Sequence, residues 1–123
     1  MPYLETQHEA LAWAAGFYEG EGYCGTTHDR RRVLPGVVIT IHNTDLGMLE
    51  RFQECVYGLG RIYGPYSYRG PDRKPMYRWA AQRFDHAQAV AAFLWPLLSD
   101  RRQDQIRAAL GVYNTRRNER GLQ

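Results

Sequence analysis

The sequence predicts an α+β fold in which helices alternate with β-hairpins and lie on one face of a largely antiparallel sheet. Two segments with helical periodicity each precede a pair of strand-forming segments, and the C-terminal region is again helical. Short turn-like stretches separate the strands of each pair. Strands joined in this way pair in opposite directions, so the expected order is helix, hairpin, helix, hairpin, helix.

The first helix is expected over residues 7–18. Thr6 and Glu9 have the spacing of a capping box, in which each side chain accepts a hydrogen bond from the backbone near the other. The alanine-rich run that follows favours a helix. Gly20 and Gly22 are expected to break it.

The first hairpin is expected over residues 23–28 and 37–42. The second segment, VVITIH, has the clearest strand signal in the chain, and its alternation turns Ile39 and Ile41 toward the core. A second helix is expected to begin at residues 43–45, to place apolar residues with period 3.6, and to end at Gly58-Leu59-Gly60.

The later elements follow the same logic. They are a hairpin over residues 61–68 and 77–80, a helix over 87–95 and a helix over 100–113. Asp85 is expected to cap the first of these helices, and Pro96 to interrupt the chain between them. Residues 114–123 are expected to form a frayed polar tail of a single domain that spans 1–123.

Composition limits the classes of protein that fit. The 123 residues are 44% hydrophobic, which suits one compact core. No apolar run approaches the roughly 18–20 residues that span a membrane, and the N-terminus lacks the layout of a signal peptide. We therefore expect a cytoplasmic protein of a bacterium, phage or organelle. Cys24 and Cys55 are too few for a disulfide framework or a zinc site and are expected to be buried.

Charge is unevenly distributed along the chain. The net charge is +3, yet residues 1–29 contain five acidic residues and no Lys or Arg. The rest of the chain therefore carries all 16 basic residues, of which 15 are Arg. Such segregation indicates a polyanionic partner, and Arg is well suited to phosphate and guanine. A GC-rich genome explains the arginine content about equally well.

The end of the first helix carries the most informative segment. Residues 14–22, AAGFYEGEG, place Glu19 and Glu21 on either side of one glycine. A stripe of small residues runs along the same helix: Ala12, Gly16 and Gly20. If the stripe packs against a second copy, two-fold symmetry gathers the carboxylates, whose oxygens suit Mg²⁺. Spacing alone favours a simpler interpretation, a solvated helix end with two surface glutamates.

The same segment resembles the LAGLIDADG motif of homing endonucleases. It has Ala for the first Leu, Phe-Tyr for the Leu-Ile pair and Glu for each Asp. The order of the expected elements is also similar to that family's domain, and residues 42–64 look like its second helix and third strand. The resemblance covers residues 4–113. It implies a saddle-shaped sheet and a homodimer, since each chain has one motif.

The activity that the resemblance implies is site-specific cleavage of double-stranded DNA with Mg²⁺ at a long, roughly palindromic site. The gene of such a homing endonuclease would lie in an intron or intein. One alternative is a cleavage-deficient DNA- or RNA-binding protein on the same fold, such as an intron-splicing maturase. Another is a dimerisation module in which the stripe is purely structural, which leaves the basic turns unexplained.

The resemblance also implies roles for individual residues. Glu21 matches the acid that binds the metal, and Gly20 matches the residue whose carbonyl helps. Asn43 falls beside the scissile phosphate, and Arg101 or Arg102 falls near the basic residue of the active site. The implied dimer interface contains Ala12, Ala15, Gly16, Glu19 and Gly20.

Strand alternation from Glu21 predicts which side chains face DNA. The expected strand contacts are Tyr23, Thr27, Thr40, His42, Arg61, Tyr63 and Arg78. Arg61 and Arg78 are the best candidates for reading base edges in the major groove. The hairpin turns are expected to hold phosphates through Arg30, Arg31, Arg32, Arg69, Arg73 and Lys74. For each of these turn residues, a solvated turn that binds nothing is the alternative.

Overall fold

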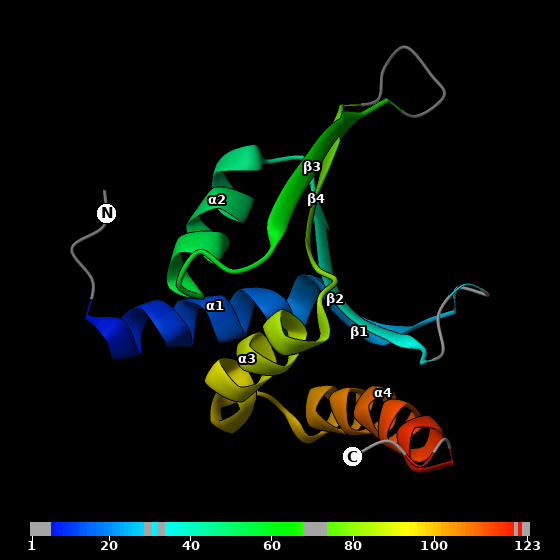
Figure 1. The fold of residues 1–123 in the computed structure, drawn as a ribbon. Helices are drawn as coiled ribbons and strands as arrows, with labels where there is room; N and C mark the ends of the chain where they lie inside the picture. Colours follow the sequence, from blue (N-terminus) through cyan, green and yellow to red (C-terminus); the bar gives the residue numbers. More distant parts are fainter. Residues whose placement is uncertain (1–5, 29–30, 32–33, 68–73, 120, 122–123) are drawn as a thin grey trace.

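The structure is a computed structural model that describes residues 6–28, 31, 34–67, 74–119 and 121 (Figure 1). Its elements are α1 (Gln7–Glu21), β1 (Gly22–Thr27), β2 (Gly36–Asn43), α2 (Leu46–Cys55), β3 (Arg61–Tyr66), β4 (Met76–Ala81), α3 (Phe84–Leu94), a 3₁₀ turn η1 (Trp95–Leu97) and α4 (Asp100–Glu119). Helices and hairpins alternate as predicted, so the α+β fold class is confirmed.

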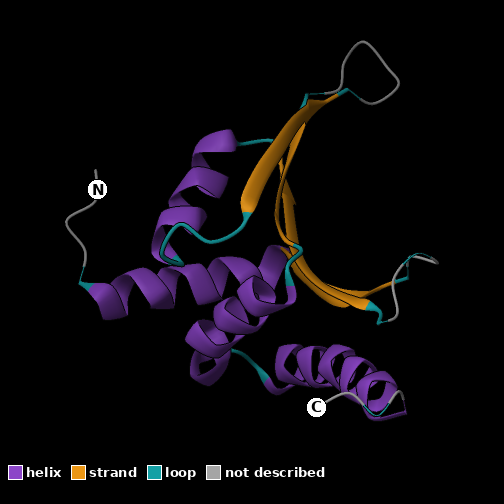
Figure 2. Cartoon of the chain, in the orientation of Figure 1, coloured by secondary structure: helices purple, strands orange, loops and turns teal. Residues whose placement is uncertain are grey.

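The strands form one antiparallel sheet in the order β1-β2-β4-β3. The two hairpins therefore meet along their inner strands, β2 and β4. Figures 1 and 2 show that α1, α2 and α3 lie on one side of this curved sheet, while α4 runs below the β1–β2 hairpin. The opposite face of the sheet has no helix on it in these views, which leaves it available for a partner.

Alternation along β2 decides which side chains enter the core. Ile39 and Ile41 are fully buried against the helices, as predicted, and Ile41 pairs across the sheet with the buried Trp79. The Trp79 indole donates a hydrogen bond to the Leu59 carbonyl at 2.9 Å. A Cβ at Gly60, where φ is +81°, would overlap the Trp79 ring, so the turn after α2 requires glycine.

Two helix ends differ from the prediction. Helix α1 continues to Glu21, so Gly20 does not break it, because contacts from α4 hold its last turn. Helix α4 continues to Glu119, so residues 114–119 are helical and the expected frayed tail is wrong for them; residues 120, 122 and 123 lie outside the described residues. Arg116 and Arg117 lie in its last turn, where they offset the negative end of the helix dipole, and Arg116 pairs with Glu119.

The start of α3 also differs from the prediction. Arg83 occupies the N-cap position without a side-chain cap bond, and Asp85 lies in the first turn rather than at the cap. The Asp85 carboxylate instead accepts two hydrogen bonds from the Arg83 guanidinium. Pro96 interrupts the chain as predicted, since it lies in the 3₁₀ turn between α3 and α4.

Two further expectations concern the whole chain. Among the residues that the structure describes, no helix is both long enough and apolar enough to cross a membrane. Cys24 and Cys55 are both buried, as expected, and both are free thiols.

Candidate nucleic-acid interface and active site

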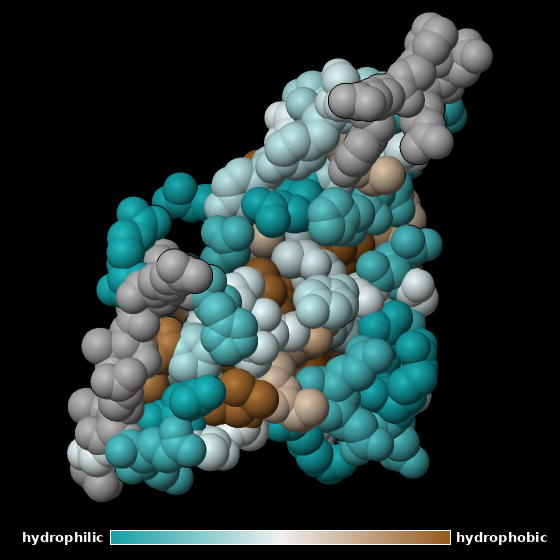
Figure 3. Space-filling view, turned by 90° about the vertical axis from the view of Figure 1, so that its right-hand side faces the viewer, coloured by the Kyte–Doolittle hydropathy of each residue, from teal (hydrophilic) through white to brown (hydrophobic). Residues whose placement is uncertain are grey.

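The helix-free face of the sheet carries the side chains that alternation predicted. Thr40 pairs with Tyr23 on one side and Ala80 on the other, while Arg78 pairs with His42 and Tyr63. Directly paired residues point to the same face of a sheet, so these side chains share one surface. Figure 3 looks onto this side of the molecule, where hydrophilic and near-neutral residues surround smaller hydrophobic areas.

Electrostatics favour an anionic partner on this face. The four strands contain Arg61, His42 and Arg78 but no acidic residue. The Arg78 guanidinium carbon lies 4.8 Å from the centre of the Tyr63 ring. Within the described part of the chain, the buried Nε of Arg78 has no hydrogen-bond partner. The contact with Tyr63 holds the cationic guanidinium of the half-buried Arg78 in place on the sheet.

Exposure separates the predicted contact residues on the strands into three groups. The Tyr23 side chain is 57% exposed, and Thr27, His42 and Arg61 are also exposed. Tyr63 and Arg78 are half-buried. Thr40 is only 7% exposed, because it lies between the side chains of neighbouring strands. Thr40 therefore lies on the predicted face but offers little surface to a ligand.

The two hairpin turns are only partly described. Arg31, between β1 and β2, and Lys74, two residues before β4, are both exposed. Four predicted phosphate contacts lie outside the described residues: Arg30, Arg32, Arg69 and Arg73.

The helix end that carries the two acids adjoins this face. Glu21 is the last residue of α1 and is exposed, and β1 begins at the next residue. The β1–β2 ladder begins where Gly22 pairs with Ile41, so Glu21 lies directly before the first paired residue of β1. No group of three or more His, Cys, Asp or Glu side chains gathers at one point in the described residues. The described part of one chain thus does not form a cluster of three such side chains around Glu21.

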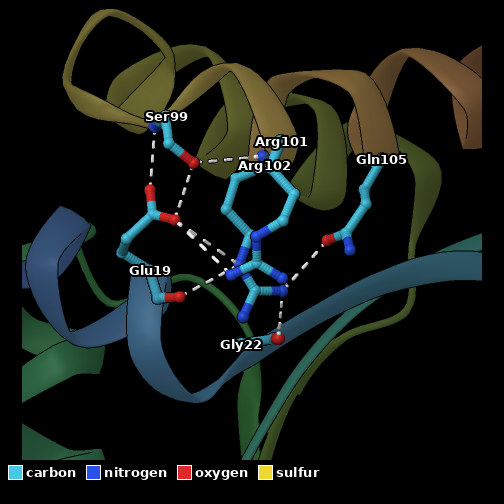
Figure 4. Close-up of polar contacts among 6 residues, drawn as sticks. All are labelled: Glu19, Gly22, Ser99, Arg101, Arg102 and Gln105. Carbon is cyan, nitrogen blue, oxygen red and sulfur yellow. Dashed lines mark hydrogen bonds and ion pairs between the residues drawn. The ribbon is translucent and has the colours of Figure 1, made fainter.

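Glu19 has a different environment, because its carboxylate binds the start of α4 (Figure 4). One oxygen accepts the Ser99 backbone N–H at 2.8 Å, and the other accepts the Ser99 hydroxyl at 2.7 Å. These hydrogen bonds, the backbone one first, hold the pKa of Glu19 below its ordinary value of 4.5. Glu19 therefore joins α1 to α4 rather than facing solvent beside Glu21.

The structure distinguishes the two adjacent arginines. The Arg102 side chain is buried, and it donates to the Glu19 carbonyl at 3.0 Å and to the Gly22 carbonyl at 2.7 Å. The Arg101 side chain is 65% exposed, with one nitrogen 3.8 Å from the Glu19 carboxylate. Only Arg101 of this pair presents its guanidinium at the surface, where a phosphate can reach it.

Asn43 ends β2 and helps to start α2. Its side-chain oxygen accepts the Asp45 backbone N–H at 2.8 Å, and the Asp45 carboxylate in turn accepts the Met48 N–H at 3.3 Å. This is an Asx turn followed by a helix N-cap. The side-chain oxygen of Asn43 is therefore engaged within the chain, and its NH₂ group is the part that can donate a hydrogen bond to another partner.

The stripe of small residues on α1 faces solvent. Ala12, Gly16 and Gly20 are exposed, and a Cβ built on either glycine would meet nothing within 4 Å. Two other residues of the expected interface lie elsewhere. Ala15 is buried in the core of its own chain, and Glu19 is engaged with α4.

Sequence reasoning did not find two members of this site, Ser99 and Gln105. Ser99 accepts the Arg102 backbone N–H at 3.3 Å, and its position before Asp100 is a recognisable N-cap signal. The Gln105 side chain accepts a hydrogen bond from Arg102 at 3.0 Å. No local pattern marks Gln105, because its partner binds residues about 80 positions earlier in the chain.

Comparisons with known proteins give matches to solved structures. No protein-family model and no curated protein matches the sequence. The structure is similar to the homing endonuclease I-CvuI in complex with its target in the presence of Ca, with a TM-score of 0.66 and 20% identity over 89% of this chain. It is also similar to the group I intron-encoded homing endonuclease I-CeuI complexed with DNA, with a TM-score of 0.67 and 15% identity over 95% of this chain.

A third similar structure is the LAGLIDADG meganuclease I-AabMI bound to uncleaved DNA, with a TM-score of 0.67, 18% identity and 89% of this chain covered. The match spans 71% of the I-CvuI chain, 61% of the I-CeuI chain and 38% of the I-AabMI chain. The chain therefore has the fold of LAGLIDADG homing endonucleases, as the resemblance of residues 14–22 predicted.

Proposed function

We propose that this protein is a homing-type endonuclease that binds double-stranded DNA on the helix-free face of its sheet and cleaves it as a homodimer. The observation that carries the proposal is the position of Glu21. This exposed carboxylate lies at the edge of a surface whose strands contain arginines and no acidic residue. DNA bound on that surface would bring its backbone to Glu21, and the DNA-bound structures with the same fold support this arrangement.

The exposed stripe on α1 supports dimerisation. Ala12, Gly16 and Gly20 would allow a second α1 to approach closely through its backbone. Because α1 ends at Glu21, a two-fold axis along this stripe would bring both copies of Glu21 together. Ala15 and Glu19 are not part of this proposed interface.

The residues at this place fit a divalent cation only when two chains meet. Mg²⁺ prefers oxygen ligands, and each chain offers the Glu21 carboxylate and the Gly20 carbonyl at the negative end of α1. A second copy and phosphate oxygens would supply further oxygen ligands. When bound, the ion would activate a water molecule and stabilise the leaving oxygen.

Two other residues have proposed roles at the scissile phosphate. Arg101, rather than Arg102, would offset the charge that develops on the phosphate, because it is exposed and lies across from the end of α1. The Asn43 NH₂ group would donate a hydrogen bond to a phosphate oxygen or to the attacking water.

The experiment uses the full chain and a library of randomised duplex DNA. One sample contains Mg²⁺, one contains Ca²⁺, and both the cut and the bound molecules are sequenced. We expect cutting at one roughly palindromic sequence with Mg²⁺. The Glu21→Gln variant should bind that sequence with unchanged affinity and cut it at least about 100-fold more slowly, since it lacks a charged metal ligand.

Each other outcome identifies a different function. Selective binding without cutting in either metal would replace the endonuclease by a DNA-binding protein, and the same library made as RNA would then test the maturase interpretation. If the protein binds no sequence selectively, the remaining interpretation is a dimerisation module. Full cutting by the Glu21→Gln variant would remove Glu21 from the metal site.

The same library locates the base contacts. Arg78→Ala should relax the preference at one base pair in each half-site, at a cost of about 1–3 kcal/mol. Arg83→Ala is the matched control, because Arg83 is exposed, lies outside the four strands at the start of α3 and pairs with Asp85. Equal effects of the two variants would contradict a specific role for Arg78.

A further inference from the structure

Arg102 is the one charged side chain that is buried in the described part of the chain, with 8% of its surface exposed. Arginine is seldom buried so fully unless it is paired. Its position in the first turn of α4 directs it at the junction between α1 and β1 (Figure 4). This junction contains both oxygen ligands assigned above, the Gly20 carbonyl and the Glu21 carboxylate.

The hydrogen bonds of Arg102 bracket these two residues. Its Nε donates to the carbonyl of Glu19 and its Nη1 donates to the carbonyl of Gly22. A guanidinium group is planar, so its donors have a fixed separation. The two carbonyls are therefore held at a set distance, with Gly20 and Glu21 between them.

The last turn of α1 requires such a support. Gly20 lies inside the turn and Gly22 follows it, and glycine loses more conformational freedom on ordering than any other residue. Glycine is needed at position 22 because a Cβ there would overlap the Tyr18 ring. The backbone angle is not the reason, since any residue can adopt its φ of −83°. The Glu21 carboxylate thus lies between two residues whose backbone has high conformational freedom. The hydrogen bonds from Arg102 restrict that freedom.

Arg102 is itself fixed by a closed ring of hydrogen bonds. The Glu19 carboxylate accepts from Ser99, the Ser99 hydroxyl oxygen accepts the Arg102 N–H, and the Arg102 side chain returns to the Glu19 carbonyl. The carboxylate also lies 3.8 Å from the Arg102 Nε, which offsets the buried positive charge. The ring joins the end of α1 to the start of α4, next to Arg101.

We propose that Arg102 is a positioning residue that locks the α1–β1 junction and so fixes the Gly20 carbonyl and the Glu21 carboxylate relative to Arg101. This inference rests on the proposed function for the identity of the groups that it positions. Arg102 would not touch DNA or metal, since its side chain is buried and engaged with the protein.

The test compares Arg102→Lys with Arg107→Lys in the full chain by amide hydrogen exchange at residues 20–22. Lysine keeps the charge but lacks the planar pair of donors. We expect exchange at these amides to be about tenfold faster in Arg102→Lys, because local opening there loses its restraint. Arg107 is an exposed arginine on the same helix that pairs with Asp104, so Arg107→Lys should leave these amides unchanged.

A second measurement connects the lock to the proposed cation site. Mn²⁺ is titrated against the wild type and both variants, and the paramagnetic broadening of the signals of residues 20–22 is followed. Arg102→Lys should weaken Mn²⁺ binding about tenfold. With the recognised DNA, its kcat should fall while KM stays within about twofold, because positioning acts on the reacting groups rather than on affinity.

The outcomes separate this inference from the proposed function. Unchanged exchange at residues 20–22 in a folded Arg102→Lys variant would overturn the inference. Faster exchange in a chain whose wild type neither binds Mn²⁺ nor cuts the library would overturn the proposed function and keep the lock. If Arg102→Lys does not fold, Ser99→Ala replaces it, since it removes one link of the ring; exchange as slow as in the wild type would then overturn the inference.

Discussion

Helix α1 has two faces that are built from similar small residues and have opposite environments. Ala10, Ala14 and Ala15 are buried beneath the sheet and the other helices. Ala12 and Gly16, on the other face, are exposed, and Gly16 has nothing within 4 Å of a Cβ. Small size therefore does not by itself reveal which face of a helix is packed. The buried face is covered within one chain, and the exposed face is the one on which the proposed dimer would form.

The largest expected effect comes from filling the exposed face. Gly16→Leu should raise the dissociation constant of the dimer at least about 100-fold, because the added side chain would separate the two copies of α1. Gly111→Leu is the matched control, since Gly111 is also an exposed helical glycine with nothing near its Cβ position. Sedimentation at several concentrations measures both. A wild-type chain that sediments as a monomer, or a dimeric Gly16→Leu variant, would contradict the proposed interface.

The next largest effect is expected when a larger side chain is placed on the buried face of α1. Ala15→Leu should lower the free energy of unfolding by about 1–3 kcal/mol, because the core has no room for three more carbon atoms. Ala12→Leu, on the exposed face, should leave the stability of the single chain unchanged within about 0.5 kcal/mol. Urea unfolding at low protein concentration gives both values. Equal losses of stability would mean that the two faces are not distinct within one chain.

A smaller effect concerns the Glu19 contact to α4. Glu19→Gln should lower the free energy of unfolding by about 1–2 kcal/mol at pH 7. This loss is smaller than for a fully buried carboxylate, because solvent screens the partly exposed charge of Glu19. The folded pKa of Glu19 lies below 4.5, so this stabilisation is present above pH 4.5 and is lost as pH falls through the folded pKa. Unfolding measured from pH 7 to pH 3 should show the two proteins converging. A constant difference would show that the charge is not involved.

The smallest effect is expected at Tyr18, which lies on the buried face next to Gly22. Its side chain is 1% exposed, and within the described residues its hydroxyl has no hydrogen-bond partner. Burial raises the pKa of this hydroxyl far above its ordinary value of 10. Tyr18→Phe should therefore leave stability unchanged or raise it by up to about 1 kcal/mol. If thermal unfolding instead showed that Tyr18→Phe lowers the free energy of unfolding by more than about 1 kcal/mol, the hydroxyl would have a hydrogen-bond partner.

The sequence by itself determined the fold class and the orientation of the strands. The alternation in VVITIH turned Ile39 and Ile41 inward, so it also turned His42 outward. The residues of α2 follow from helical periodicity and from Asp45 at its N-cap. These features are short-range: period, capping and turn chemistry act over a few neighbouring residues and can be recognised without knowledge of the rest of the chain.

Tertiary structure decided what depends on distant partners. The end of α1 at Glu21, the engagement of Glu19, and the difference between Arg101 and Arg102 all arise from contacts that join residues about 80 positions apart. Adjacent arginines have the same intrinsic chemistry, and only the packing of α4 against β1 buries one and exposes the other. A charge takes its role from its solvation and partners, and these are set when the chain folds.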